Sequence, residues 1–568
     1  MLQWQLRRND KFAFYQELAV AVGRIHTLKS ENVHTVWSKQ VIMNYGPLYK
    51  YYELLTDSQV YAKMKRLHLM SLSFIRKTGH GHYHTDLYCA PGMANEPLSR
   101  PLGALELMYH RSFLKGKDML TQMMHVESRL PITSFQIKEA LKCLSARHPL
   151  LRMTIQEDKY SGLCFREMKS LEVDFRTVDT DDWITVMEEE EMNRFDPDRG
   201  PLWRCKLLRY TSAGYLQHPS WHALGERVMK YNFVFVFCWH HGLVDGTYIQ
   251  WLFGDFIMYI DKVRSGFNYR SVKSLPLMPS IDTVIEYSQY INGRNNTEKI
   301  SPSILSEEAP STILRDYTLR YASEIGQLSS KIQKPKDLII QLDENDTLSF
   351  FQKCKENDAT ISGALISACC ASLVGLVYQS ETNSIKVDIP VELMVDMRRY
   401  VPDRFLLELQ GAPYPGVASL HVPLLIKFPM SKHPIDKDNF WKLSKECTSQ
   451  IKEATISGYF LRILKDEVRD SLKHHSNPLT TGKSPFVLCI SNVGKLDAVI
   501  HEEQAADYLL TDICALNSIL VDDMPIFFTL SETLCGRLIT GICYCANYTS
   551  AGTAEEFRTN LRWYLTQM

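Results

Sequence analysis

The run YNFVFVFCW at residues 231–239 limits most strongly what this chain can fold into. Successive side chains of a strand point to opposite faces, and here phenylalanines fill one face while valines and a cysteine fill the other. A strand that is apolar on both faces must be covered on both sides. Strand-like and helix-like runs are interspersed along the rest of the chain. This pattern favours a layered α/β, or mixed α+β, architecture.

Several other segments have clear patterns of their own. Residues 134–146 carry apolar side chains at helical spacing, and Pro149 prevents the helix from continuing. The run GPLWRCKLLRY at residues 200–210 is typical of a strand entered through a Gly-Pro turn. From residue 337 the pattern predicts a strand, a helix, a turn and a buried helix. Further strand-like runs follow at residues 384–395, 484–494 and 536–548.

Residues 361–378, ISGALISACCASLVGLVY, raise the question of a membrane span. The run is strongly apolar, but it is shorter than the roughly 20 residues that a membrane-spanning helix needs. It is also rich in alanine, serine and cysteine, and the polar segment KCKENDAT precedes it. We therefore predict that it is the buried core helix of a soluble protein.

Composition excludes some classes of function. The length of 568 residues suggests about three or four structural units. A net charge of −1, from 64 basic and 65 acidic residues, argues against a nucleic-acid-binding protein. The 14 cysteines contain no Cys-x-x-Cys pair, so zinc ribbons and thioredoxin-like motifs are unsupported. Scattered cysteines are typical of reduced core thiols, and with no signal-peptide-like segment at the start they predict a cytoplasmic protein.

The chain divides into regions of different character. Residues 1–95 form an N-terminal extension with helix-like stretches, and His80, His82 and His84 alternate in a polar loop within it. No cysteine or carboxylate cluster accompanies these histidines, so a solvated loop is favoured over a metal site. Residues 262–335 are more polar and irregular, as expected for a connector between two halves.

Two adjacent histidines, in the run HHGLVDG at residues 240–246, follow the apolar strand directly. If the strand persists, His240 and His241 point to opposite faces, so one of them is available for chemistry while the other is packed. A neutral imidazole, with an ordinary pKa near 6.5, suits the role of general base. A second histidine pair, at residues 474–475, lies in polar surroundings without a following Asp-Gly and is interpreted as surface.

Asp245 has three possible roles beside this pair. It could cap the helix that follows, by accepting hydrogen bonds from the first amides. It could pair with an arginine from elsewhere and hold the loop. It could also orient the histidine as in a serine-hydrolase triad, but the G-x-S-x-G elbow that would support this reading is absent from the sequence.

The pattern His-His-x-x-x-Asp-Gly after a hydrophobic strand resembles the signature of the CoA-dependent acyltransferase superfamily. Other segments resemble that superfamily in the same order, between residues 98 and 568: RPLGALELMYH, L…RHPLLR, GPLWR, CKENDATISGALISA, VDMRRYVP and SNVG. The likeness is strongest toward the alcohol acetyltransferases. The DFGWG motif of the plant enzymes and the Pro-Gly-Pro of the wax ester synthases are absent. The first 95 residues match nothing in the superfamily.

The resemblance implies a fold of two chloramphenicol-acetyltransferase-like halves with a central tunnel between them. The halves would be residues 96–261 and 336–568, joined by the connector 262–335 and preceded by the mainly helical extension 1–95. His241 would be the general base and His240 structural. Because the acyl donor and the acceptor would enter from opposite sides of the tunnel, the site would lie between the halves.

The resemblance also implies the residues that support this base. Asp245 would form a buried salt bridge with Arg398 of VDMRRY, or with Arg399 if the register differs by one. Gly246 would permit a tight turn. Ser491 or Asn492 could donate to the oxyanion, although a turn that closes the preceding strand explains the same segment equally well.

The implied activity is acyl transfer from acyl-CoA, as a co-substrate, to an alcohol or an amine, with no bound cofactor and no metal. Two alternatives stay open: a donor bound to an acyl carrier protein acting in trans, and a catalytically inactive protein that binds acyl groups or lipids. A lipid acceptor and peripheral membrane contact through residues 60–77, which are basic and partly apolar, form a further alternative. A monomer is expected.

Overall fold

The computed structural model describes residues 97–159, 161–209, 230–285, 312–328, 335–378, 385–409, 411–431, 434–456, 486–496, 507–517 and 526–568. The expected N-terminal extension, with its three alternating histidines and its basic segment, lies outside the described residues. The histidine pair at 474–475 lies outside them too. The described residues all belong to one compact unit, Asp86–Met568.

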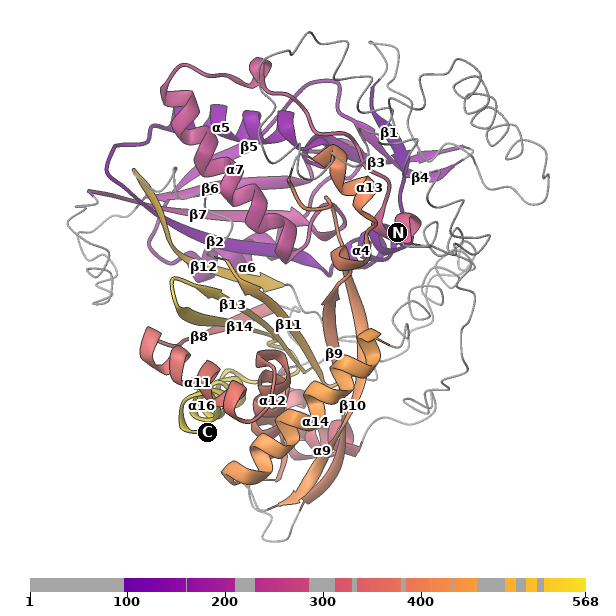
Figure 1. Cartoon of the computed structure of the whole chain (residues 1–568), viewed down its shortest axis with the longest axis vertical. Coiled ribbons are helices and arrows are strands. Elements are labelled where there is room, and N and C mark those ends of the chain that lie inside the picture. Colours follow the sequence, from indigo (N-terminus) through magenta and orange to yellow (C-terminus); the bar gives the residue numbers. More distant parts are fainter. Residues whose placement is uncertain are drawn as a thin grey trace, which may run out of the picture. The chain divides into compact units, whose positions relative to one another are not determined.

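A five-stranded sheet in the order β12-β2-β7-β6-β5 carries the strand that the sequence singled out (Figure 1). That strand is β7, Tyr231–His240, and it lies in the middle of the sheet, antiparallel to both neighbours. The other members are β2 (Met119–Ser128), β5 (Asp174–Asp179), β6 (Trp203–Arg209) and β12 (Tyr508–Asn517). A smaller sheet contains β1 (Ser99–Pro101), β4 (Gly162–Glu167) and β3 (Met153–Asp158).

Both faces of β7 are covered, as predicted. On one face, Phe235 and Phe237 meet Phe256 edge-on, with ring centroids 5.3 and 5.6 Å apart. Phe256 belongs to α7 (Gly246–Arg264), which packs beside α5 (Ser134–Arg147) over this sheet (Figure 1). On the other face, α6 (Trp183–Met192) packs against β2 and β7. The alternating apolar pattern is therefore explained by a helical layer on each side.

Helix α5 has the predicted bounds to within one residue. The Thr133 side chain caps it, and Gln136 completes a capping box by accepting from the Thr133 main-chain N–H. After the helix, His148 is fully buried and links two elements: Nδ1 lies 2.8 Å from the Tyr248 hydroxyl, and Nε2 lies 2.7 Å from Asp255. The Arg-His-Pro segment thus ends α5 and anchors it to α7.

A second sheet, of six strands in the order β10-β9-β11-β13-β14-β8, belongs to the later part of the chain. Its strands are β8 (Pro335–Gln341), β9 (Ile385–Asp396), β10 (Ser419–Ser431), β11 (Leu488–Lys495), β13 (Phe527–Leu534) and β14 (Arg537–Cys545). The helices around it are α11 (Glu344–Glu356), α12 (Ile361–Tyr378), α14 (Lys437–Ile456) and α16 (Ala551–Gln567) (Figure 1). The strands and helices predicted for this half are all present.

Helix α12 is the core helix of this half. Within the described residues it is the one helix that is long and apolar enough to cross a membrane by length and composition, and 83% of it is buried inside the fold. It packs against α14 and α16 and contacts β9 and β11. The prediction of a buried core helix is confirmed.

One strand crosses from the later part of the chain into the first sheet. Strand β12 pairs antiparallel with β2, with partners from Tyr508 opposite Ser128 to Asn517 opposite Leu120. The first sheet therefore contains a strand from the later part of the chain. The boundaries expected at residues 261 and 336 stay predictions. The segment expected to be an irregular connector also contains two helices, α9 (Thr312–Arg320) and α10 (Ala322–Leu328), and α9 packs on α12.

The cysteines of the described segments are free thiols. All of them are buried except the half-buried Cys535. This agrees with the sequence interpretation of core thiols.

Candidate active site

The histidine pair lies where β7 gives way to a turn. The strand ends at His240, a short 3-10 turn (His241–Leu243) follows, and α7 begins at Gly246. A side chain at Gly242 would place its Cβ 3.0 Å from the His240 ring and 3.3 Å from a main-chain oxygen of α4 (Ala104–Leu114). The turn can therefore fold back against His240 because this position is glycine.

His240 is fully buried and both of its ring nitrogens have partners. Nδ1 accepts a hydrogen bond from the Gly242 N–H at 3.0 Å, and Nε2 lies 3.1 Å from Nδ1 of His110. Because Nδ1 accepts, the ring proton is assigned to Nε2, which donates to His110. Burial, with His110 and His241 nearby, holds the pKa of His240 well below its usual range. The ring is neutral and is held in place through both of its nitrogens.

His241 has a different environment. Its ring stacks on Tyr109 of α4, with centroids 4.0 Å apart and planes 12° apart. The residue is 9% exposed, and within the described structure its Nδ1 makes no hydrogen bond of good geometry. Burial lowers the pKa of His241, and the carboxylates of Asp118 and Asp245 offset only part of that shift. The imidazole is therefore neutral near pH 7 and able to take a proton.

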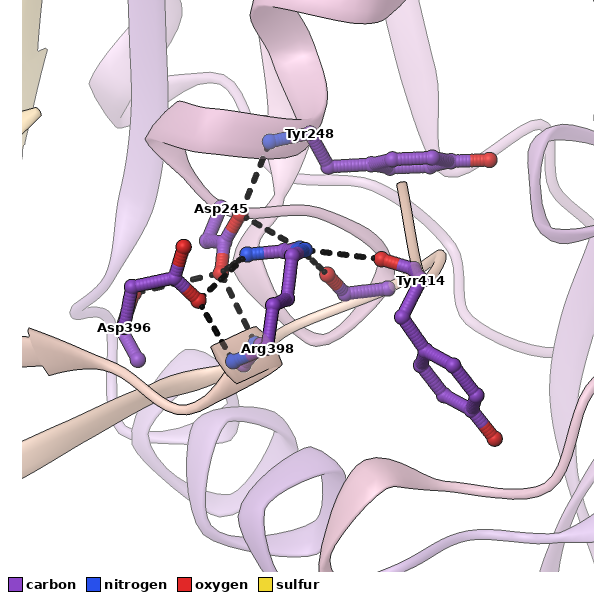
Figure 2. A network of polar contacts seen from close by, with 8 residues as sticks. Asp245, Tyr248, Asp396, Arg398 and Tyr414 are labelled. Atoms are coloured by element: carbon purple, nitrogen blue, oxygen red, sulfur yellow. Dashed lines mark hydrogen bonds and ion pairs between the residues drawn. The ribbon is translucent and has the colours of Figure 1, made fainter. Parts of the chain in front are cut away.

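Asp245 forms a two-pronged ion pair with Arg398, with both N–O distances at 2.9 Å (Figure 2). Its carboxylate also accepts from the Tyr248 N–H at 3.0 Å, from the Ala418 N–H at 2.8 Å and from the Ser419 hydroxyl at 3.2 Å. The helix cap and the arginine pair, which the sequence left as alternatives, are thus both present. The carboxylate is saturated by these groups, so the serine-hydrolase arrangement is not formed.

Arg398 uses all five of its side-chain N–H groups. Besides the two bonds to Asp245, it donates to the main-chain oxygens of Tyr414 and Gly416, at 2.8 and 2.7 Å, and to Asp396 at 3.1 Å (Figure 2). Burial raises the pKa of Asp245 and lowers that of Arg398, but their mutual attraction outweighs burial in both cases. The net result is a lowered pKa for the aspartate and a raised pKa for the arginine, so both stay charged.

Arg399, the alternative partner, does not take this place. Its side chain is exposed and its guanidinium lies 4.9 Å from the ring centre of Tyr400. Arg398 lies just after β9 of the second sheet, whereas Asp245 caps α7 over the first sheet. The ion pair therefore ties the two halves together at the start of the helix that follows the His241 turn.

Gly246 opens α7, and the role in a tight turn that the resemblance implied for it stays a prediction. Its backbone does not adopt the left-handed conformation that favours glycine in tight turns. Instead, a Cβ at this position would lie 2.9 Å from a methyl carbon of Val493 on β11. The absence of a side chain allows β11, from the second half, to approach the histidine turn closely.

Ser491 and Asn492 lie on this same strand, next to Val493. The Asn492 side-chain amide donates to the Ser362 hydroxyl at 3.1 Å, and its oxygen accepts from the Gly494 N–H at 3.2 Å. The pairing of β11 with β13 is irregular between Asn492 and Gly494. Asn492 therefore shapes a local bulge inside β11. The strand continues to Lys495, so the expected turn that would close the strand at this segment is wrong. The oxyanion role of Ser491 stays a prediction.

Three residues around His241 were not singled out from the sequence: Tyr109, Asp118 and His421. Tyr109 lies within a segment that carried the family resemblance, but no spacing marks it as a neighbour of His241. Asp118 adopts a positive φ of 55°, a backbone conformation unusual for a non-glycine residue and invisible in the sequence. His421 comes from β10, a strand that no sequence pattern had predicted.

Neither a scan against protein-family models nor a search of the curated proteins found a significant match to this chain. Solved structures do match. The trichothecene 15-O-acetyltransferase of Fusarium sporotrichioides covers 86% of this chain and is itself covered to 99%, with a TM-score of 0.56 and 13% sequence identity. The chain has an acyltransferase and condensation-domain fold.

Two further structures agree with this fold. Polyketide synthase associated protein 5 from Mycobacterium tuberculosis gives a TM-score of 0.52 at 13% identity, covering 82% of this chain and 98% of its own. The condensation domain of the monacolin K polyketide synthase gives 0.53 at 13% identity, covering 83% and 98%. The predicted fold class is confirmed. The identities are low, so the likeness extends to the fold alone.

Proposed function

We propose that this protein is an acyltransferase that moves an acyl group from acyl-CoA to an alcohol, with His241 as the general base. One observation carries the proposal: a neutral, nearly buried imidazole stands on a turn locked by the Asp245–Arg398 ion pair. The likeness of the fold to an O-acetyltransferase supports it. The buried, bonded environment of His240 supports a structural role for that residue.

The proposed reaction needs one base and good positioning. The hydroxyl proton of the acceptor passes to His241 as the oxygen attacks the thioester carbonyl, and a C–O bond forms. The resulting oxyanion collapses, the C–S bond breaks, and the leaving thiolate takes the proton from His241. A thioester is already reactive, so alignment and general-base catalysis are enough without a covalent enzyme intermediate. No metal or bound cofactor takes part in this proposal.

The ion pair would act through the backbone rather than on the substrate. It fixes the start of α7 and the segment after β9, so the turn that carries His241 has few alternative conformations. The Asn492 side chain is held by its bonds to Ser362 and Gly494, and Ser491 is the side chain of this pair that we propose binds the oxyanion.

A carrier-protein-bound donor is the second candidate, and the likeness to a condensation domain favours it. An amine acceptor would use the same base. Product analysis with free acyl-CoA separates these candidates, because a carrier-dependent enzyme would not turn over the free thioester efficiently.

The test is mass spectrometry of products after incubation with mixed acyl-CoAs and a panel of alcohols, sterols, glycerides and amines, with thiol release followed in parallel. Wild type should form product, and His241→Ala should lose at least about a hundredfold of the rate. His125→Ala is the control, because His125 is a buried histidine of the same sheet whose ring bonds to Thr511.

A folded His241→Ala variant with wild-type turnover would contradict the assignment of the base. If none of the three proteins forms product with any acyl-CoA, the result would point to a carrier-bound donor or to a binding protein without catalysis.

A further inference from the structure

Tyr109 connects His241 to a second histidine on the other half of the molecule. One side of the connection is the ring stack on His241, at 4.0 Å. The other is the Tyr109 hydroxyl, which lies 2.9 Å from Nε2 of His421 on β10. Nδ1 of His421 in turn lies 3.0 Å from the carboxylate of Glu392 on β9. A continuous chain of contacts thus runs from Glu392 to the ring of His241.

The carboxylate sets the direction of these hydrogen bonds. A carboxylate only accepts, so Nδ1 of His421 must carry the proton that points to Glu392. In neutral His421, Nε2 then accepts from the Tyr109 hydroxyl. An O–H group that donates to a basic nitrogen gains negative charge on its oxygen and ring, and hydrogen bonds in such a chain strengthen one another.

Because the two rings are stacked, the negative charge on the Tyr109 ring acts on His241. When His241 takes a proton, its positive ring lies face to face with the aromatic ring of Tyr109. A cation over an aromatic face is stabilised, and more so where water is excluded. Other charges also act on His241: Asp118 and Asp245 favour its protonated form, and His421 disfavours it if protonated. This repulsion is absent while His421 is neutral, which is also the state in which its Nε2 can accept from Tyr109.

We propose that Glu392, His421 and Tyr109 form a positioning relay that stabilises the protonated ring of His241. The inference rests on the proposed function, because a protonated His241 forms when the acceptor hydroxyl is deprotonated. None of the three residues needs to touch the substrate. The relay holds the plane of His241 through the stack and makes it a stronger base through the polarised tyrosine. The relay also includes residues of both halves, so the second half of the chain influences the pKa of His241.

The direct test reads the pKa of His241 without any substrate. Exchange of the histidine C2 hydrogen for deuterium, followed by mass spectrometry across pH, reports each histidine separately. Tyr109→Phe keeps the stack but removes the hydroxyl, and Glu392→Gln keeps the shape but removes the charge. Both should lower the pKa of His241, and the double variant should lower it no further than Tyr109→Phe alone. Tyr317→Phe, which removes a buried hydroxyl bonded to Thr549, is the control and should change nothing.

Turnover provides the second readout. With the donor found for wild type, kcat at neutral pH should fall about threefold to tenfold in Tyr109→Phe and Glu392→Gln, with KM unchanged, because a weaker base accepts the proton less readily. An unchanged pKa of His241 in both variants, or additive shifts in the double variant, would overturn the relay. A shifted pKa in proteins that show no transfer at all would support the relay and count against the proposed function.

Discussion

The two halves of the molecule meet at two buried places that are held together in opposite ways. The first, the ion-pair junction, consists of Asp245 and Arg398, and all five N–H groups of that guanidinium are bonded. The second, the carboxyl junction, consists of Glu191 on α6 and Asp337 on β8, and the charge of Asp337 acts on Glu191. Here several carboxyl oxygens have no hydrogen-bond partner in the described structure. Similar burial thus produces a charged contact in one place and a largely protonated one in the other.

The difference lies in the compensating charge. At the ion-pair junction, Arg398 more than offsets the cost of burial, and the pKa of Asp245 falls. At the carboxyl junction, burial and the negative charge of Glu188 raise the pKa of Asp337 to about 8, and burial with the charge of Asp337 raises the pKa of Glu191 well above its usual range. A buried acid without a cation stays protonated.

The two junctions therefore respond to pH in opposite directions. Asp245 binds its proton less tightly when folded, so its contribution to stability is present above its unfolded pKa and is lost as pH falls through its folded pKa. Asp337 binds its proton more tightly when folded. The folded state then holds the extra proton, and stability falls as pH rises from the ordinary range of an aspartate toward 8.

Breaking the ion-pair junction should have the largest effect. Arg398→Met leaves Asp245 buried without its partner and should lower the free energy of unfolding by about 3–5 kcal/mol, with loss of transfer activity. Urea unfolding and the product assay measure these effects. Arg399→Met is the matched control, because that side chain is exposed, and it should change stability by less than about 0.5 kcal/mol. Equal effects of the two substitutions would show that the junction has been assigned to the wrong arginine.

A steric change at the same junction should have a smaller effect. Gly246→Ala forces Val493 away from the start of α7 and should cost about 1–3 kcal/mol in unfolding free energy. Adding Val493→Ala should restore part of this loss, because it removes the methyl groups that clash. A double variant no more stable than Gly246→Ala alone would mean that strain elsewhere in the turn causes the loss.

Removing a charge from the carboxyl junction should have the smallest effect, and it should depend on pH. Asp337→Asn keeps the shape but cannot ionise, so it should change stability little at pH 5 and raise it by about 1–2 kcal/mol at pH 9. Unfolding curves across this range measure the slope. The exposed Asp403, changed to Asn, is the control and should leave the slope as in wild type. A parallel slope in Asp337→Asn would show that this carboxyl is not held protonated.

Sequence reasoning reached the parts of this structure that local pattern determines. The two apolar faces of β7, the helical spacing of α5 and the composition of α12 each depend on neighbouring residues, and each prediction is confirmed. The Asp245–Arg398 pair spans 153 positions and was reached through a family resemblance rather than from the spacing.

Other parts depend on contacts that no local pattern encodes. The place of β12 beside β2 is a choice of partner, and strand propensity does not specify partners. Tyr109 and His421 are 312 positions apart in the sequence but lie in contact in the fold. Neither has a sequence pattern that distinguishes it from an ordinary core residue. The close approach of Val493 to Gly246 was also beyond local pattern, because that methyl group belongs to another strand.

The place of β12 in the first sheet has a consequence for how this protein is made. During synthesis the first sheet stays incomplete until residues 508–517 have left the ribosome, because β12 supplies its outer strand next to β2. Until then β2 is an unprotected edge, rich in methionine, and unprotected edges invite pairing with other chains. A fragment that contains only the first half would expose the same edge of β2. Neither the nascent chain nor such a fragment can complete the first sheet without β12.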